Sequence, residues 1–281
     1  MKLRKEIELI IINILAIFSP KIAKLFAFRK VNGITFSNAH RKQGEIELLL
    51  LPYLLNKDSL FIDVGSNKGV YSFFSEKIIS ENNIIAFEPV PKLAAMLKGL
   101  FPKAIIIEKA LSDHKGKAVL NIPIHTENYL LDTRSTLEEE SPELLNKFEK
   151  ITVETITLDE FIKSNKIENI TLIKIDVEGH ELKLLKGSEN TLIKNHPFLI
   201  IEIELINHKD NLNTIFQYID HLEYLIFYLE IKSHSLIQVY NSDGELLVPL
   251  EKLKQNHNYI CIPKINSSFV QGINEKLNNK N

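Results

Sequence analysis

The sequence predicts an α/β protein with a doubly wound, mostly parallel seven-stranded sheet and an N-terminal helical extension. Three observations support this. The 281 residues suffice for one large domain with a substantial core. From about residue 45 onward, apolar strand-like runs alternate with helical patterns, and no internal repeat interrupts them. The first run, residues 60–64, is almost continuously apolar and precedes Gly65, as expected for a strand buried on both faces.

The first half of the sheet is predicted from three apolar runs. Strands are expected at residues 60–64, 84–87 and 104–107. Helices are expected over residues 70–78 and 93–100, where apolar side chains recur at helical spacing. Strand and helix thus alternate, as parallel strands joined by crossover helices require.

The second half repeats this alternation and completes the main domain. A helix is expected after the fourth strand and another near residues 212–222. We place the domain at residues 43–265, after a helical extension over residues 1–42 and before a polar tail over residues 266–281. The four remaining strands are predicted at residues 171–176, 198–205, 225–229 and 259–262.

The N-terminal extension contains an apolar segment, Ile7 to Phe18, that is too short to span a membrane. Glu8 and Asn13 interrupt it, and a span needs about 18 to 20 residues. No small-residue cleavage site follows it, which disfavours a signal peptide. We expect an amphipathic helix or helical hairpin packed on the domain or at the interface of a homo-oligomer. Peripheral membrane contact through residues 7–28 is the alternative.

Composition excludes several classes of protein. The 34 Lys and Arg nearly balance the 36 Asp and Glu, so the net charge of -2 gives no reason to expect a nucleic-acid partner. Cys261 is the only cysteine, which rules out an intramolecular disulfide and any multi-cysteine metal site. The histidines show no metal-site spacing, so no metal is expected. A single cysteine fits a cytoplasmic location, with or without membrane association.

Residues that follow the predicted parallel strands are the ones to examine for function, because ligands bind at the carboxyl ends of such strands. After the first strand, Asp63 begins a turn in which Gly65 and Gly69 let a ligand approach the backbone closely. Asn67 stands where a dinucleotide fingerprint has its second glycine, which favours a smaller nucleoside over a pyrophosphate. The alternative is a tight turn without a ligand.

Glu88 follows the second predicted strand, 25 residues beyond Asp63. An acidic residue in this position can accept both ribose hydroxyls of an adenosine-containing ligand. A solvated or helix-capping glutamate is the alternative. The combination with the glycine turn favours the ligand site.

Several blocks in order along the chain resemble the motifs of FkbM-family methyltransferases, over about residues 43 to 204. The resemblance implies a class I, Rossmann-like fold that uses S-adenosyl-L-methionine, most often for O-methylation of a sugar or natural-product hydroxyl. The blocks are F-I-D-V-G-S-N-K-G (61–69), F-E-P (87–89), A-L-S-D with Gly116 (110–113), T-L-D (157–159) and I-K-I-D-V-E-G-H-E (173–181).

The resemblance also implies roles for individual residues. The methionine end of the cofactor would lie along Gly65, Asn67 and Gly69, and the ribose would bind Glu88. The turn over residues 110–113 would lie beside the adenine. One departure is Glu108, where family members commonly have asparagine, and it weakens the adenine-side assignment. The expected cofactor contacts are therefore Asp63, Gly65, Asn67, Gly69, Glu88, Ser112 and Asp113.

The block over residues 173–181 supplies the catalytic candidates. Methyl transfer from a sulfonium needs the acceptor oxygen aligned with the methyl group and its proton accepted. His180 is the candidate base, because histidine titrates near neutrality, and Asp176 would position the acceptor or the cofactor's amino group. An outward-facing His180 is the alternative, as is a metal-assisted route through Asp176 with Glu202 or Glu204. Lys174 could pair with a neighbouring glutamate and be structural.

Two segments between the third and fourth strands have separate interpretations. Residues 121–150 are polar and charged and would form an acceptor-side lid above the cofactor, with Tyr129 and Arg134 as candidate contacts. A solvated surface loop is the alternative. Thr157 followed by Glu160 is typical of a helix capping box, so Asp159 is expected to be structural.

The sequence thus predicts an S-adenosyl-L-methionine-dependent O-methyltransferase acting on a small-molecule or glycan acceptor, in a glycan or glycolipid. A catalytically silent nucleoside-binding or scaffold protein is one alternative. A nicotinamide-dependent oxidoreductase is the other, disfavoured by the incomplete glycine fingerprint.

Overall fold

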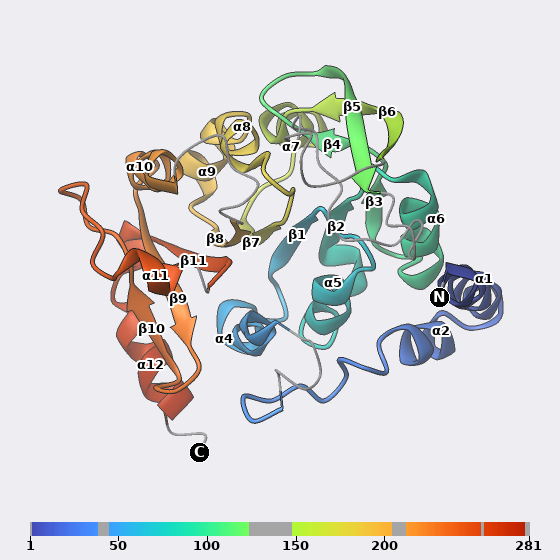
Figure 1. Ribbon diagram of the computed structural model, residues 1–281, viewed down its shortest axis with the longest axis horizontal. Coiled ribbons are helices and arrows are strands. Elements are labelled where there is room, and N and C mark those ends of the chain that lie inside the picture. The colour runs from blue at the N-terminus through green and yellow to red at the C-terminus, as the bar shows by residue number, and fades with distance from the viewer. Residues whose placement is uncertain (1, 39–44, 124–147, 204–211, 254–255, 279–281) are drawn as a thin grey trace.

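The computed structural model describes residues 2–38, 45–123, 148–203, 212–253 and 256–278 (Figure 1). Its centre is an eight-stranded sheet in the order β10-β9-β11-β8-β7-β1-β2-β3. Neighbouring strands run parallel from β3 to β8, and β11 is antiparallel to both β8 and β9. The strands are β1 (Leu60–Val64), β2 (Ile84–Phe87), β3 (Ile105–Ile107), β7 (Ile170–Ile175), β8 (Phe198–Glu202), β9 (Tyr224–Glu230), β10 (Ser235–Gln238) and β11 (Asn258–Pro263).

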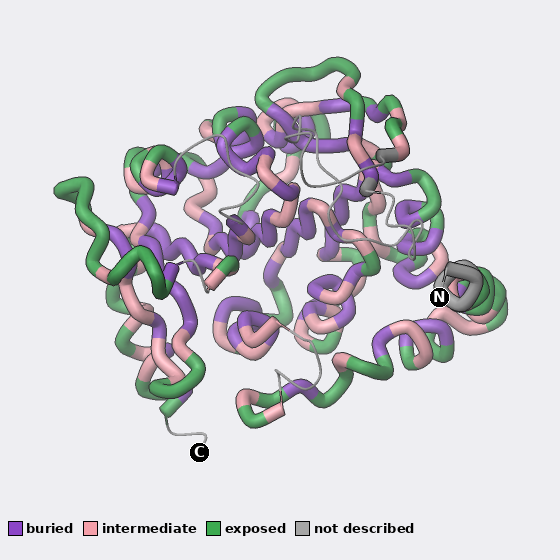
Figure 2. The backbone as a smooth tube through the Cα atoms, viewed as in Figure 1, coloured by how far each residue is buried: buried purple, intermediate pink, exposed green. Residues whose placement is uncertain are grey.

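All seven predicted strands are present in this sheet, and β10 adds an eighth at its edge. Both faces of the sheet are covered, which explains why its central strands are mostly apolar. In β1, Ile62 and Val64 join the core on one face while Phe61 joins the core on the other. Figure 2 shows the central strands as an almost unbroken buried layer.

Helices α7 to α10 cover one face of the sheet and α4, α5 and α12 the other (Figure 1). The predicted helix cap at Thr157 is present, since its hydroxyl accepts a hydrogen bond from the Glu160 amide. Asp159 has a structural role, because its carboxylate accepts from the amides of Asn190 and Thr191 at the start of α9. The helices are α4 (Leu51–Leu54), α5 (Val70–Ser75), α6 (Pro91–Leu100), α7 (Leu158–Asn165), α8 (Glu181–Lys186), α9 (Glu189–Asn195), α10 (Leu212–His221), α11 (Leu250–Leu253) and α12 (Phe269–Asn278), with 3-10 turns at Ile46–Leu50, Glu81–Asn83 and Lys264–Asn266.

The order of the strands reverses between β1 and β7. From β1 the chain continues outward to β2 and β3, and it then returns to place β7 and β8 on the opposite side of β1. A crevice forms at the carboxyl ends of the strands at such a switch point. Gly65 after β1 and Asp176 after β7 therefore lie beside each other.

A second, three-stranded sheet stands next to this edge in the order β4-β6-β5. It consists of β4 (Ala110–Leu111), β5 (Gly116–Pro123) and β6 (Phe148–Ile156). The expected lid over residues 121–150 begins and ends in its β5–β6 pair. Residues 124–147, with Tyr129 and Arg134, lie outside the described part of the chain.

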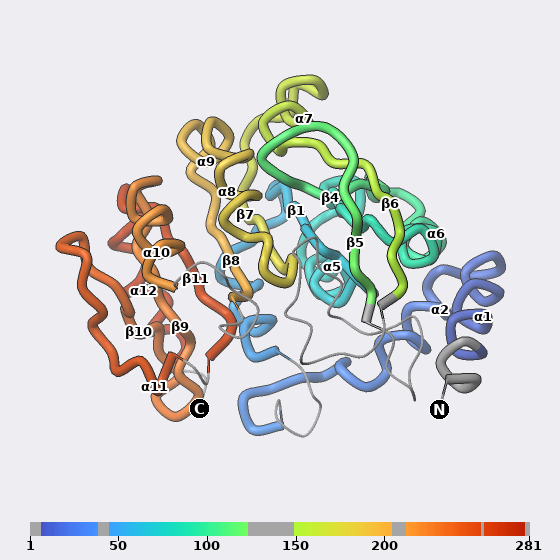
Figure 3. The backbone as a smooth tube through the Cα atoms, turned by 45° about the horizontal axis from the view of Figure 1, so that its top comes forward, coloured from blue at the N-terminus to red at the C-terminus, as the bar shows by residue number. Residues whose placement is uncertain are grey.

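The N-terminal extension forms a helical hairpin of α1 (Lys2–Phe18) and α2 (Pro20–Ala27). Ser19 caps α2 by accepting from the Ile22 amide, and Pro20 begins the helix. The hairpin packs on α6, as Figure 3 shows, with Ile12, Ala16 and Phe28 in one apolar cluster with residues of that helix. No helix in the described ranges is long and apolar enough to cross a membrane.

The expected polar tail, residues 266–281, instead contains α12. Ile273 and Leu277 of this helix are buried in the same core as Leu236 of β10. The Asn274 side chain accepts a hydrogen bond from the Leu236 amide at 2.8 Å. Apolar residues four apart give α12 a narrow packed stripe within an otherwise polar segment, so this part of the chain completes the sheet's covering layer.

Candidate active site at the strand switch point

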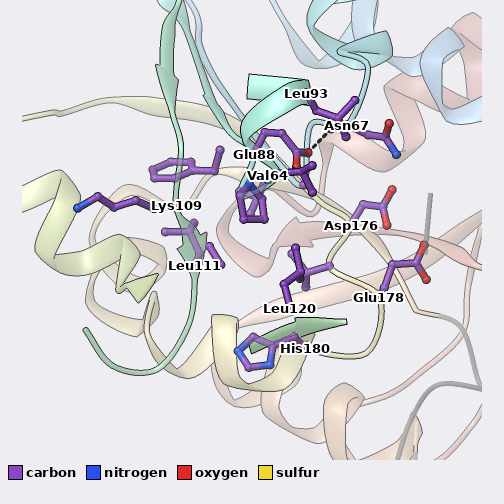
Figure 4. A pocket seen from close by; sticks show the side chains of 16 residues that line it. Val64, Asn67, Glu88, Leu93, Lys109, Leu111, Leu120, Asp176, Glu178 and His180 are labelled. Atoms are coloured by element: carbon purple, nitrogen blue, oxygen red, sulfur yellow. Dashed lines mark hydrogen bonds between the residues drawn. The ribbon is translucent and has the colours of Figure 1, made fainter. Parts of the chain in front are cut away.

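A cleft lies at the carboxyl ends of β1, β2 and β7 (Figure 4). Most of its polar lining comes from the turns after these strands, and α6, β4 and β5 contribute apolar residues. The lining residues are Val64, Gly65, Asn67, Phe87, Glu88, Pro89, Val90, Leu93, Lys109, Ala110, Leu111, Leu120, Asp176, Val177, Glu178 and His180.

Gly65 and Gly69 have different tasks in the turn after β1. Gly65 lines the cleft with a φ of +71°, and a Cβ atom there would lie 1.8 Å from the carbonyl oxygen of Asp176. Only glycine allows β7 to approach the turn so closely. Gly69 has a φ of +79° and precedes α5, but it faces Leu97 and Phe101 of the protein core instead of the cleft.

Glu88 is fixed by two backbone amides. The Asn67 amide donates to Glu88 Oε2 at 2.8 Å and the Val90 amide donates to Oε1 at 2.8 Å. Burial raises the pKa of Glu88 to about 7, although these two hydrogen bonds act in the opposite direction. An acidic group that is buried, yet lines a cleft, can gain hydroxyl donors from a ligand.

Asp63 does not line the cleft. Its Oδ2 atom accepts from the Ser72 hydroxyl at 2.6 Å and from the Ser72 amide at 3.2 Å, which ties β1 to α5. Burial raises the pKa of Asp63 to about 6, against the lowering effect of these hydrogen bonds. The structure therefore gives Asp63 a bracing position within the fold in place of the expected direct contact.

The expected adenine-side turn is divided between cleft and surface. Lys109, Ala110 and Leu111 line the cleft, whereas Ser112 and Asp113 do not. Ser112 is buried behind it, with its hydroxyl 2.9 Å from His180 Nε2. Asp113 is exposed and pairs with Nδ1 of the adjacent histidine at 2.7 Å.

Asp176 faces the cleft with an unsatisfied oxygen. Its Oδ1 atom is buried and has no hydrogen-bond partner in the described part of the protein. Burial raises its pKa well above the ordinary range, and the nearby Lys174 ammonium partly counteracts this. Such an atom is suited to receive a donor from a ligand.

The structure separates the two catalytic candidates. Figure 4 shows the His180 ring directed away from Asp176, and the Ser112 contact holds it on the β4 side of the cleft. Glu178, with a φ of +50°, lies in the loop between them and also lines the cleft. His180 and Asp176 therefore do not form a pair.

Lys174 is the centre of a buried charge cluster beneath Asp176. Its Nζ atom lies 3.4 Å from Glu202 Oε2, 3.8 Å from Glu45 Oε2 and 3.0 Å from Asn258 Oδ1. Burial alone would lower the pKa of Lys174, but the surrounding carboxylates raise it above its usual value. The predicted pairing with Glu202 is present. Glu204 lies outside the described residues, and the described ranges contain no group of three metal-ligating side chains.

Sequence reasoning missed the apolar wall of the cleft. Val90 and Leu93 at the start of α6 and Leu120 of β5 all line it. The stripe of α6 was visible in the sequence but only as a packing face. Leu120 could not be found from strand-end spacing, because it reaches the cleft through the second sheet.

The cleft's chemistry fits S-adenosyl-L-methionine. The unsatisfied Asn67 Oδ1 atom and the backbone at Gly65 suit an amino-acid end, and Glu88 suits a ribose diol. The apolar residues at Leu93 and Leu111 suit a planar base. This fold, with its cleft at the β1–β7 switch point, defines a class I methyltransferase.

Comparison with known proteins gives the family. The family model of the methyltransferase FkbM domain matches residues 63–229. The chain belongs to the FkbM methyltransferase family, and this membership implies S-adenosyl-L-methionine as the methyl donor.

Two curated relatives are similar over a large part of the chain. Hexuronic acid methyltransferase AglP of Haloferax volcanii is 30% identical over 204 residues, which cover 67% of this chain and 76% of the relative. The 2-O-methyltransferase NoeI of Sinorhizobium fredii is 28% identical over 155 residues, 50% of this chain and 62% of the relative.

Two solved structures are more distant. A methyltransferase FkbM from Methylobacillus flagellatus KT has a TM-score of 0.45 and 12% identity, over 92% of this chain and 59% of that one. A precorrin-6y C5,15-methyltransferase from Geobacter metallireducens GS-15 has a TM-score of 0.37 and 13% identity, over 78% of this chain and 85% of that one. The chain thus spans less than two thirds of the length of that FkbM structure and of NoeI.

Proposed function

We propose that this protein transfers a methyl group from S-adenosyl-L-methionine to a hydroxyl of a sugar, in a glycan or glycolipid. The observation that carries the proposal is the pair of carboxylates that line the cleft beside Gly65 in a chain of the FkbM family: Glu88, which is buried, and Asp176, whose Oδ1 atom is buried. The names of two relatives, a hexuronic acid methyltransferase and a 2-O-methyltransferase, support a sugar hydroxyl as acceptor.

In this proposal different residues of the cleft bind different parts of the cofactor. Glu88 accepts the two ribose hydroxyls, since its oxygens already point into the cleft with backbone amides behind them. Asn67 and the backbone at Gly65 hold the methionine end. Leu93 and the Lys109–Leu111 segment enclose the adenine.

Asp176 is the proposed general base. The cofactor supplies an electrophilic methyl group on a sulfonium. The acceptor oxygen must lie in line with that methyl group and lose a proton as the new O–C bond forms. Asp176 Oδ1 has a free acceptor position in the cleft, and burial raises the pKa of this carboxyl, which makes it a stronger proton acceptor than an exposed aspartate.

His180, the base expected from the sequence, is a positioning residue in this proposal. Its contact with the Ser112 hydroxyl links the start of α8 to the end of β4, so it shapes the adenine side of the cleft. A cytoplasmic location belongs to the same proposal, because the single buried cysteine requires no oxidising compartment.

Calorimetry with S-adenosylhomocysteine and with NAD tests the cofactor. We expect binding of the first and little of the second, and Glu88→Ala should weaken binding by about 1 to 3 kcal/mol because ligand hydroxyls lose their partner. Equal or tighter binding of NAD would favour an oxidoreductase instead.

The acceptor is tested by incubating the protein with isotopically labelled S-adenosyl-L-methionine and a panel of glycans that includes hexuronic acids. We expect one labelled methyl group on a sugar oxygen, located by mass spectrometry. Binding of S-adenosylhomocysteine without transfer to any hydroxyl acceptor would favour the silent nucleoside-binding protein.

A further inference from the structure

The α1–α2 hairpin has an apolar face that no part of the described chain covers. While Ile12, Ala16 and Ala23 pack inward on α6, the opposite side is exposed, with Ile17 at 81% and Phe18 at 83% of their full accessibility. Figure 2 shows this outward side of the hairpin as exposed. Its members, here named the outer face, are Ile7, Ile10, Ile11, Ile14, Ile17, Phe18, Ile22 and Leu25.

The outer face has a regular helical spacing. Its residues follow helical periodicity along α1 and continue onto α2, so they form one surface instead of scattered apolar positions. Soluble monomers rarely expose a contiguous apolar patch of this kind without a use for it. Seventeen residues of α1 extend for about 25 Å, enough for a helix that lies along a surface.

The charge of the N-terminal segment indicates which kind of surface covers the outer face. Residues 1–30 contain seven Lys and Arg and two Glu, a net charge of +5 in a chain whose net charge is -2. Lys21, directly before Ile22 of the outer face, and Lys30 are exposed, and Glu8 pairs with Arg29 at 2.9 Å. The first turn of α1 adds three further basic residues in the sequence, Lys2, Arg4 and Lys5.

We infer that the hairpin docks on an anionic lipid surface, with α1 and α2 in the plane of the membrane and the outer face inserted among the acyl chains. An apolar helix face bordered by cations is the pattern that binds anionic lipids. A second copy of the chain fits less well, since a two-fold interface would bring two hairpins together that are both positively charged, even with Lys24 buried against Glu76 and Glu81. The docking does not depend on the proposed methylation.

The hairpin also connects the lipid surface to the cleft. It packs on α6, and Val90 and Leu93 at the start of α6 belong both to the cluster beneath the hairpin and to the lining of the cleft. The docked hairpin and the cleft would therefore be connected through a single helix, α6.

Co-sedimentation of the full chain with vesicles tests this inference. We expect binding to vesicles that contain phosphatidylglycerol, weak binding to pure phosphatidylcholine, and a loss of binding as salt is raised. The double variant Ile17→Ser, Phe18→Ser should bind these vesicles at least about tenfold more weakly, because both apolar side chains are removed from the acyl region. Both are more than four-fifths exposed, so their replacement spares the core.

Matched controls distinguish an effect of the outer face from the effect of replacing any exposed apolar or charged residue. Ile265→Ser removes an isoleucine that is 77% exposed at the other end of the sequence and should leave vesicle binding unchanged. Lys21→Glu with Lys30→Glu should abolish the preference for anionic vesicles, whereas Lys57→Glu, at another exposed lysine, should not. Absence of binding to anionic vesicles, or equal loss in the Ile265 control, would overturn the inference. Sedimentation of a lipid-free dimer that Ile17→Ser, Phe18→Ser converts to monomer would assign the outer face to a second copy.

Discussion

Glu88 shows how a single side chain can be prepared for a ligand before the ligand arrives. Its two oxygens accept one backbone amide each, which fixes the carboxylate while leaving further lone pairs toward the cleft. Its pKa is raised because burial outweighs these two bonds. Ribose hydroxyls would stabilise the ionised form, so cofactor binding and ionisation of Glu88 should be coupled.

The first prediction is therefore that affinity for S-adenosylhomocysteine falls as pH drops below about 7. A protonated Glu88 cannot accept from both hydroxyls, so the dissociation constant should rise by up to about tenfold per pH unit below that pKa. Titration calorimetry from pH 5.5 to 8.5 measures the change. In Glu88→Gln the affinity should be lower and nearly independent of pH over this window. An unaltered pH dependence in this variant would assign the titration to another group.

The second prediction distinguishes Asp176 from His180. Asp176→Asn should lower turnover by about 10²- to 10⁴-fold, leave affinity for S-adenosylhomocysteine near normal, and remove the decline in rate toward acid pH. That decline is expected in the native protein because the raised pKa of Asp176 keeps the base protonated below it. In His180→Gln the amide can still hydrogen-bond to Ser112, so this variant should retain the acid limb. Loss of that limb in His180→Gln, with Asp176→Asn still active, would return the base to His180.

For single residues, the sequence predicts where the backbone lies better than it predicts where the side chain points. Gly65, Asn67, Glu88 and Asp176 line the cleft because strand ends fix where their backbones lie. Asp63 differs because its carboxylate is taken by Ser72, nine residues further along the chain. His180 and Ser112 meet across 68 residues, so no local pattern could have shown their contact.

Among the elements, the turn after β1 is the one that geometry constrains most. The Asp176 amide donates to the Val64 carbonyl at 3.0 Å, so the chain after β7 is held against this turn by a backbone hydrogen bond. Gly65 is the residue that makes room for it. Glycine is therefore required here both by the left-handed backbone and by the contact between elements.

The third prediction follows from that contact. Gly65→Ala should lower the free energy of unfolding by at least about 2 kcal/mol and abolish binding of S-adenosylhomocysteine. The alanine side chain would clash with the backbone of Asp176, so β1 and β7 would have to separate. Gly272→Ala is the matched control. It lies inside α12 with no atom within 4 Å of the added carbon, so it should stabilise the protein by up to about 1 kcal/mol. Thermal melts of both variants check this, and equal melting temperatures would contradict it.

The elements that were missed share a physical cause. The ranges of β1 and β2 were predicted to the residue, because strands buried on both faces are almost entirely apolar, with Asp63 the exception in β1. The β5–β6 pair has polar residues such as Lys117 and Asn121 on its strands, so its pattern resembles a surface loop. Helix α12 buries only a narrow stripe, and half of its ten residues are polar or charged.

For the molecule as a whole, the N-terminal hairpin joins a core that the domain would otherwise leave open. Phe28 stacks on Phe73 of α5 with ring centroids 4.4 Å apart. Lys24 is buried against Glu76 and Glu81, and its ammonium also lies 4.4 Å from the centre of the Phe101 ring. The hairpin therefore has two distinct sides, an inner one that completes the core and the outer face exposed to the surroundings.

The fourth prediction concerns the inner side. Deletion of residues 1–30 removes Ile12, Ala16, Ala23 and Phe28 from their cluster and exposes the apolar stripe of α6. It also leaves the half-buried Glu76 without the Lys24 ammonium, which now lowers its pKa against the effect of burial. The truncated protein should therefore melt at a lower temperature, bind a hydrophobic dye and aggregate.

The control for this deletion is the double variant Ile17→Ser, Phe18→Ser, which alters the outer face alone. It should melt within a few degrees of the native protein and remain dispersed, because neither side chain belongs to the core cluster. Differential scanning calorimetry and light scattering compare the three proteins. If the truncated chain stays dispersed with an unchanged melting temperature, the hairpin does not complete the core, and its contacts with α6 contribute nothing measurable to stability.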